Sequence, residues 1–92
     1  MPRQRPPSAE DMRKRTESVA AQVLVGRRVV EARYMTEEER NEFGWFTSPL
    51  VLRLDDGSFL VPQQDAEGNG GGVLCMIPQP SGDAKDVVFG TF

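Results

Sequence analysis

Length, composition and charge already exclude several kinds of chemistry for this chain, which has 92 residues, no histidine, a single cysteine and a net charge of −3. Without histidine, neither a Ser-His-Asp nor a Cys-His nucleophile system can form, and the usual zinc sites of His and Cys are excluded as well. Because Cys75 has no second cysteine to pair with, no intramolecular disulfide can form, and we expect a reducing, cytoplasmic location.

The N-terminal segment differs in charge from the rest of the chain. Residues 1–17 hold five basic and three acidic side chains, a net +2, whereas the remainder holds six basic and eleven acidic side chains, a net −5. Residues 1–7 are rich in Pro and Arg and are expected to form a disordered tail without the apolar stretch of a secretory signal. No apolar run is long enough to cross a membrane. We therefore expect this tail, an N-terminal helix over 8–25 and a small β domain over 26–92.

The N-terminal helix is predicted from its cap and its periodicity. Ser8 is a suitable N-cap, and Asp11 stands where the acid of a capping box belongs. Gly26 is a natural end. Apolar side chains recur at helical spacing, interrupted at Thr16, on one face formed by Met12, Val19 and Val23. This helix is a candidate cover for a sheet edge, either within one chain or across a dimer.

A strand and a short helix follow. Residues 28–34 alternate, with Val30, Ala32 and Tyr34 on one face, as in a half-buried strand. Thr36 and Glu39 then form a complete capping box, and Gly44 stands where a helix-terminating glycine belongs.

The clearest pattern in the chain is a β-hairpin. Asp56-Gly57 between alternating apolar runs predicts a two-residue type I′ turn joining strands of about 50–55 and 58–63. That turn pairs Leu54 with Phe59 and Leu52 with Val61. One face of the hairpin would then carry five apolar side chains, those of Leu50, Leu52, Leu54, Phe59 and Val61.

Two more strands complete the predicted fold. Residues 73–77 form a continuous apolar run, consistent with a strand buried on both faces, and residues 86–92 form a last strand. Cys75, inside the first of these, is interpreted as a buried small hydrophobic residue. Residues 79–83 have turn composition. The fold class is therefore mainly β (α+β): a small antiparallel SH3-like barrel or curled sheet of about five strands, with an N-terminal helix and one short helix.

Several motifs together resemble a family of small uncharacterised bacterial proteins. The motifs are Gly26-Arg27, Tyr34-Met35-Thr36-Glu37-Glu38-Glu39, Gly44-Trp45 and Leu54-Asp55-Asp56-Gly57. Pro62, Asp65, Glu67, Gly68 and Asn69 also fit that pattern. The resemblance covers roughly residues 26–72. It implies a shared fold and brings no assigned activity, cofactor or site residue.

The loop Asp65-Ala66-Glu67-Gly68-Asn69-Gly70 is the nearest match to a metal-binding motif. Asp65, Glu67 and Asn69 fall at positions one, three and five of a calcium-loop pattern with glycine at six. Position twelve, however, is Met76 instead of a bidentate Glu, and the flanking segments are strand-like. A divalent-metal-dependent activity at loop 65–72 is therefore kept only as an alternative, and no cofactor is expected.

The acidic residues of the short helix and of the hairpin need no catalytic explanation. The helix acids cap a helix start and complement its dipole, and the hairpin acids suit a turn. These residues are Glu37, Glu38, Glu39, Glu42, Asp55 and Asp56.

Four residues are candidates for a partner-binding surface: Arg33, Tyr34, Trp45 and Phe46. Adjacent residues of an extended segment point in opposite directions, so we expect one of the two aromatics at 45 and 46 in the core and the other nearer the surface. The interpretation that we favour over this one is that both aromatics pack as lids on the core. An exposed aromatic beside an arginine is typical of an interaction hot spot.

The resulting functional hypothesis is a non-enzymatic module that binds an unknown protein partner or itself, with a homodimer as one form. The alternative is nucleic-acid binding through the basic cluster Arg13-Lys14-Arg15. Interleaved acids and the lack of neighbouring aromatics favour a solvated helix face there.

Overall fold

The computed structural model describes residues 8–78 and 85–92 and shows an α+β fold with two helices and five antiparallel strands in two sheets. The predicted tail over 1–7 lies outside the described residues, and so does the predicted turn over 79–83. The elements, in chain order, are α1 (Ala9–Leu24), β1 (Val29–Tyr34), α2 (Glu37–Phe43), β2 (Leu50–Leu54), β3 (Phe59–Leu60), β4 (Leu74–Met76) and β5 (Val87–Phe89).

Both helices begin at the predicted caps. The Ser8 hydroxyl accepts a hydrogen bond from the Asp11 N–H, and the Ser8 N–H donates to the Asp11 carboxylate. At α2, Thr36 and Glu39 exchange the same pair of bonds. Gly44 ends α2 in the left-handed conformation at φ 72°, which glycine adopts without a steric penalty. These predictions are confirmed. Capping is predictable from sequence because it depends on residues only three positions apart.

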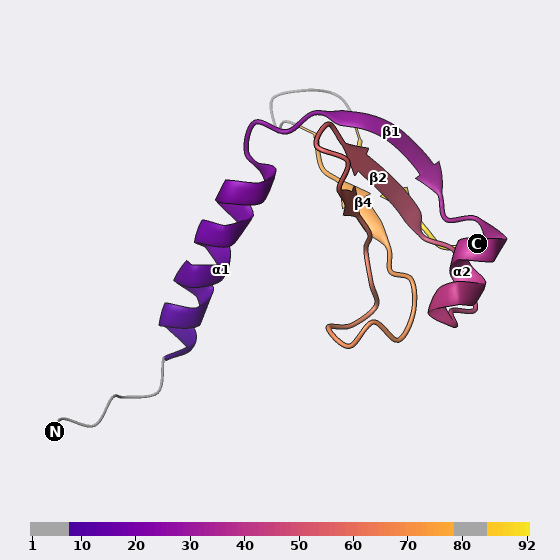
Figure 1. Cartoon of the computed structure of the whole chain (residues 1–92), viewed down its shortest axis with the longest axis horizontal. Helices are drawn as coiled ribbons and strands as arrows, with labels where there is room; N and C mark the ends of the chain where they lie inside the picture. The colour runs from indigo at the N-terminus through magenta and orange to yellow at the C-terminus, as the bar shows by residue number, and fades with distance from the viewer. Residues whose placement is uncertain (1–7, 79–84) are drawn as a thin grey trace, which may run out of the picture.

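The strands form one three-stranded sheet, in the order β1-β2-β3, and one two-stranded sheet of β4 and β5. In Figure 1, β4 lies beside β2, so the two sheets form layers, while α1 extends away from both. The expectation of a curled sheet fits this arrangement, but the described strands do not close into a barrel. Strand β3 has only two residues, and the connection from it to β4 is a single bridge between Gln63 and Gly71.

The predicted hairpin register is wrong by one residue. Leu52 pairs with Leu60 and Arg53 with Phe59. The loop has three residues, in which Gly57 alone has a positive φ, of 89°. The Leu54 N–H donates to the Ser58 carbonyl at 2.8 Å, and the Gly57 N–H donates to the Leu54 carbonyl at 3.0 Å. Asp-Gly suits this longer loop as well as the type I′ turn, because only its glycine must be left-handed.

The slip of one residue moves Phe59 and Val61 to the opposite face, because side chains alternate along a strand. Leu50, Leu52 and Leu54 keep the predicted common face, and Leu60 takes the place opposite Leu52 that was assigned to Val61. Strand β1 pairs with β2 through Ala32–Leu52 and Tyr34–Leu50, with a register shift between Val29 and Glu31. This shift places Val29, and not Val30, opposite Leu54.

Each face of the three-stranded sheet has its own covering. On one face, Val51 packs with Met35 and Trp45, and Val61 lies against this cluster. On the other face, Leu50 and Leu54 are buried. This second face is turned toward the two-stranded sheet.

The prediction that 73–77 is buried on both faces is wrong. Leu74 is half-buried, Cys75 is exposed, and Val73, Met76 and Ile77 are 54–74% exposed. The pairs Leu74–Phe89 and Met76–Val87 share one face of the two-stranded sheet, and Cys75–Val88 the other. No described element covers that outer face. The apolar run 73–77, which the sequence predicted to be a core strand, is therefore in contact with solvent.

The glycines at 71 and 72 allow two backbone segments to come close together. A Cβ at Gly72 would lie 2.6 Å from the Gln63 carbonyl oxygen, and one at Gly71 would lie 2.7 Å from Cδ of Pro49. Close approach of this kind accounts for glycine in this loop without a bound phosphate or metal.

Gly72→Ala is expected to lower the free energy of unfolding by about 1–3 kcal/mol, because the new Cβ must displace backbone. Gly90→Ala is the matched control, since nothing lies within 4 Å of a Cβ there, and its stability should be unchanged or slightly higher. Urea denaturation of both variants measures the difference. Equal stability of the two would contradict the close packing of this loop.

Candidate functional site

The four residues predicted as a partner surface do not form one site. Trp45 is 6% exposed, whereas the neighbouring Phe46 is 95% exposed. One aromatic is therefore in the core and the other on the surface, and the favoured interpretation that both pack as lids on the core is wrong. Arg33 and Tyr34 point to opposite faces of β1, since Arg33 lies opposite Val51 and Tyr34 opposite Leu50.

Trp45 is a structural residue. Its Nε1–H donates a hydrogen bond of 2.7 Å to the Gly68 carbonyl, which ties the end of α2 to the loop that follows β3. Its ring stacks on Phe43 with centroids 4.9 Å apart. Among the described residues, Phe46 has no comparable ring contact, and it is the most exposed of the large hydrophobic side chains.

Tyr34 also packs within the chain. Its ring meets Phe92 edge to face, with centroids 4.9 Å apart. Two backbone hydrogen bonds between Ser48 and Phe92, of 2.6 and 3.0 Å, hold residue 92 at this place.

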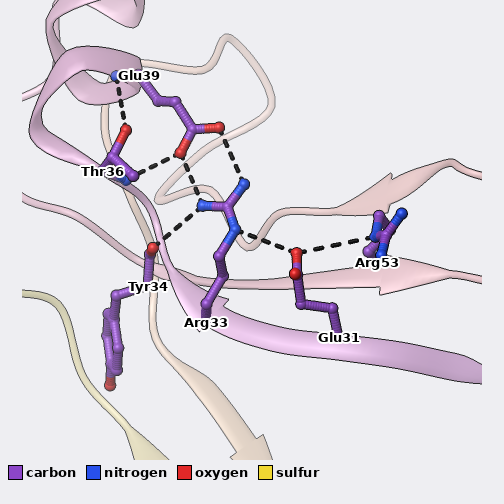
Figure 2. A network of polar contacts seen from close by, with 6 residues as sticks. All are labelled: Glu31, Arg33, Tyr34, Thr36, Glu39 and Arg53. Atoms are coloured by element: carbon purple, nitrogen blue, oxygen red, sulfur yellow. Dashed lines mark hydrogen bonds and ion pairs between the residues drawn. The ribbon is translucent and has the colours of Figure 1, made fainter.

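Arg33 is the centre of a polar network on the sheet face that also carries Val51 (Figure 2). Its guanidinium donates two hydrogen bonds to the Glu39 carboxylate, of 2.8 and 3.2 Å, and one of 3.2 Å to Glu31. Arg53 lies 3.8 Å from the same Glu31 carboxylate. The Arg33 guanidinium carbon is 6.0 Å from the centroid of the Phe59 ring. This network joins β1, β2 and the start of α2.

The network has a clear electrostatic effect on Glu39. The hydrogen bonds from Arg33, followed by that from the Thr36 N–H, lower the pKa of the Glu39 carboxyl from its ordinary 4.5 to about 2. The charged form is thus favoured in the folded chain. Glu39 therefore acts as a cap and as an ion-pair partner, and not as an acid that gives up a proton near neutral pH.

The loop residues Asp65, Glu67 and Asn69 lie together, but Asp65 is used by its own loop. Its carboxylate accepts hydrogen bonds from the backbone N–H of Glu67 at 3.0 Å, and from the backbone N–H and the side-chain amide of Asn69 at 3.2 and 2.9 Å. The hydrogen bond from the Asn69 side chain is the main reason why the pKa of Asp65 is lowered. Within the described residues, no group of three or more His, Cys, Asp or Glu side chains is placed to hold a metal ion.

The basic cluster Arg13-Lys14-Arg15 lies on α1, which has no buried residue. Arg13 is hydrogen bonded to Glu10 at 2.9 Å and lies 3.5 Å from the Glu17 carboxylate. Part of the positive charge of the cluster is thus balanced within the helix.

The described residues also form an apolar groove, which sequence reasoning missed. It has a volume of about 540 Å³ and lies between the two sheets. Val29, Ala32, Leu50 and Leu52 line it from one side, and Leu74, Cys75, Met76 and Phe89 from the other. A second hollow of about 230 Å³ shares Leu52 and Leu74 with it and continues toward Leu60 and Pro62. The alternation in β1 and β2 marked these residues as apolar, but no sequence signal showed that the two sheets leave a space between them.

Comparisons of the chain with protein-family models, with curated proteins and with solved structures find no match. The resemblance of residues 26–72 to small bacterial proteins therefore stays a prediction. No helix of the described residues is long and apolar enough to span a membrane.

The Glu39 network predicts a specific pH dependence. Because the folded-state pKa is below the ordinary value, the stabilisation is complete above about pH 4.5 and is lost as the pH falls through about 2. In Glu39→Gln, this part of the acid destabilisation should be absent, and the variant should be less stable than the parent at neutral pH. Urea denaturation over a pH series measures both effects.

Glu38→Gln is the control for this experiment, since Glu38 lies in the same helical turn and outside the network. Its pH dependence should follow that of the parent chain. A Glu39→Gln variant with the parent's acid profile would contradict the assigned ion pair.

Proposed function

We propose that this chain is a non-enzymatic binding module, built on a small curled sheet of SH3-like scale, that acts by contacting another protein chain or a second copy of itself. The observation that carries the proposal is the state of α1. The helix is correctly capped and 16 residues long, yet none of its residues is buried.

An unpacked helix of this length is marginally stable in water. Most helical stability in proteins comes from packing an amphipathic face against other elements. With 16 residues, α1 is only slightly longer than the about 12–15 residues below which isolated helices are marginal even in Ala-rich sequences. The apolar side chains Met12, Val19 and Val23 are 49–57% exposed. Because α1 adds nothing to the core of its own chain, its apolar side chains are available for contact with another one.

The carboxylates support a role without catalysis. Glu39, Asp56 and Asp65 all have lowered pKa values, caused first by hydrogen bonds from Arg33, Ser58 and Asn69 respectively. Each of these bonds belongs to a cap, a turn or a loop. General acid catalysis near neutral pH needs a raised pKa instead.

The two alternative functions have less support. The Arg13 guanidinium is partnered by two glutamates of its own helix, which weakens the case for a nucleic-acid surface. The Asp65 carboxylate is occupied by N–H donors, which weakens the case for a divalent ion. We place the module in the cytoplasm, because its lone cysteine is exposed and suits a reducing compartment.

Size-exclusion chromatography with light scattering over a concentration series tests the proposal. We expect a mass above that of the monomer, or stoichiometric capture of an identified protein by the full chain. The helical signal in far-ultraviolet circular dichroism should increase as the complex forms, because α1 gains packing. A monomer at every concentration that also captures no stoichiometric partner would overturn the proposed function.

A further inference from the structure

Two apolar surfaces of the described chain are open to solvent and match each other in character. One is the groove between the sheets, which continues along β2 toward β3 through Leu52 and Leu74. The other is the stripe of Met12, Val19 and Val23 on α1, with spacings of seven and four residues. These spacings place the three side chains on one side of a helix.

We propose that α1 of one copy lies in the groove of a second copy, and that the second copy returns the same contact, so that the two chains exchange their N-terminal helices. The contact is then self-complementary, as two-fold symmetry requires. This inference rests on the proposed function, because it names both the partner and the surface.

The linker between α1 and β1 favours exchange over docking within one chain. The Arg27 N–H donates to the Leu24 carbonyl at 3.1 Å, and the Asp55 N–H donates to the Arg28 carbonyl at 2.9 Å. The Arg27 guanidinium lies 3.6 Å from Asp56 and 4.0 Å from Asp55. These contacts hold the linker against the hairpin turn, and α1 leaves the sheets in the direction seen in Figure 1.

Docking α1 in its own groove would reverse the chain between Leu24 and Val29, because Val29 itself lines the groove. The contacts of Arg27 and Arg28 with the hairpin would then be lost. A helix from a second copy reaches the groove while every one of these contacts is kept.

The area of the exchange is sufficient for a dimer. With 16 residues, α1 is about 24 Å long and about 10 Å wide. Two such helices, each laid along a groove, bury on the order of 1,000 Å² in total, which reaches the lower limit for specific association. Two α1 helices packed only on each other would bury roughly half of that.

Val19→Asp tests the helix face, with Ala21→Asp as the matched control. The two positions are about 200° apart around the helix, and both are exposed in the single chain, so neither substitution should unfold it. We expect Val19→Asp to raise the dimer dissociation constant at least ~10-fold, and Ala21→Asp to change it by less than about twofold. Light scattering over a concentration series measures both.

Disulfide trapping identifies the groove as the acceptor. In a Cys75→Ser background, Met76→Cys on the inner face of β4 is combined with Val19→Cys or Val23→Cys, and with Ala21→Cys as the control. Mild oxidation should yield a covalent dimer with a bridge between position 76 and position 19 or 23, confirmed by peptide mapping. The control should yield much less.

The outcomes separate this inference from the proposed function. A dimer unaffected by Val19→Asp, or a bridge found only within a monomer, overturns the exchange and leaves self-association or partner binding standing. The absence of any bridge above the control also overturns it. A chain that is always monomeric but captures a stoichiometric protein overturns the exchange alone, whereas a monomer without any partner overturns both.

Discussion

The indole N–H of Trp45 connects two segments that are 23 residues apart, and much of the fold depends on that connection. Its bond to the Gly68 carbonyl holds the loop after β3 against the end of α2. The ring itself closes one face of β2 by packing with Met35 and Val51. With one tryptophan in the chain, only one sheet face can be closed in this way.

The consequence is an asymmetric molecule. One face of the three-stranded sheet has the Trp45 cluster and the Arg33 network, which joins β1, β2 and α2 through side-chain hydrogen bonds and ion pairs (Figure 2). The other face meets a short two-stranded sheet and leaves a groove of about 540 Å³. Small domains bury a low fraction of their surface, and in this chain part of the remaining apolar surface lies at that groove and along α1. Exchange of α1 between copies would cover both surfaces at once.

Prediction from sequence succeeded where the deciding contacts are local. It failed where the structure depends on contacts between separate elements. Thr36 and Glu39 predicted a capping box, because the two residues are three positions apart and their side chains come close together if a helix begins there. Asp56-Gly57 predicted a turn but not the length of its loop. Because the loop is one residue longer than predicted, Phe59 lies on the opposite face of the hairpin. Val73 to Ile77 was interpreted as a buried strand because a continuous apolar run carries no information about what lies on either side of it. The ion pair of Arg33 with Glu39 joins a strand to a helix, and alternation suggested only that Glu31 and Arg33 share a face.

By itself, the sequence determined the positions of both helices, the presence of the hairpin and the absence of imidazole chemistry. These features depend on composition or on neighbours within a few residues, where backbone geometry leaves few choices. Only the tertiary structure decided the hairpin register, the exposure of Cys75, the use of Asp65 within its own loop, and the groove between the sheets. Each of these depends on which segments distant in sequence come to lie together, and that is set by packing over the whole chain.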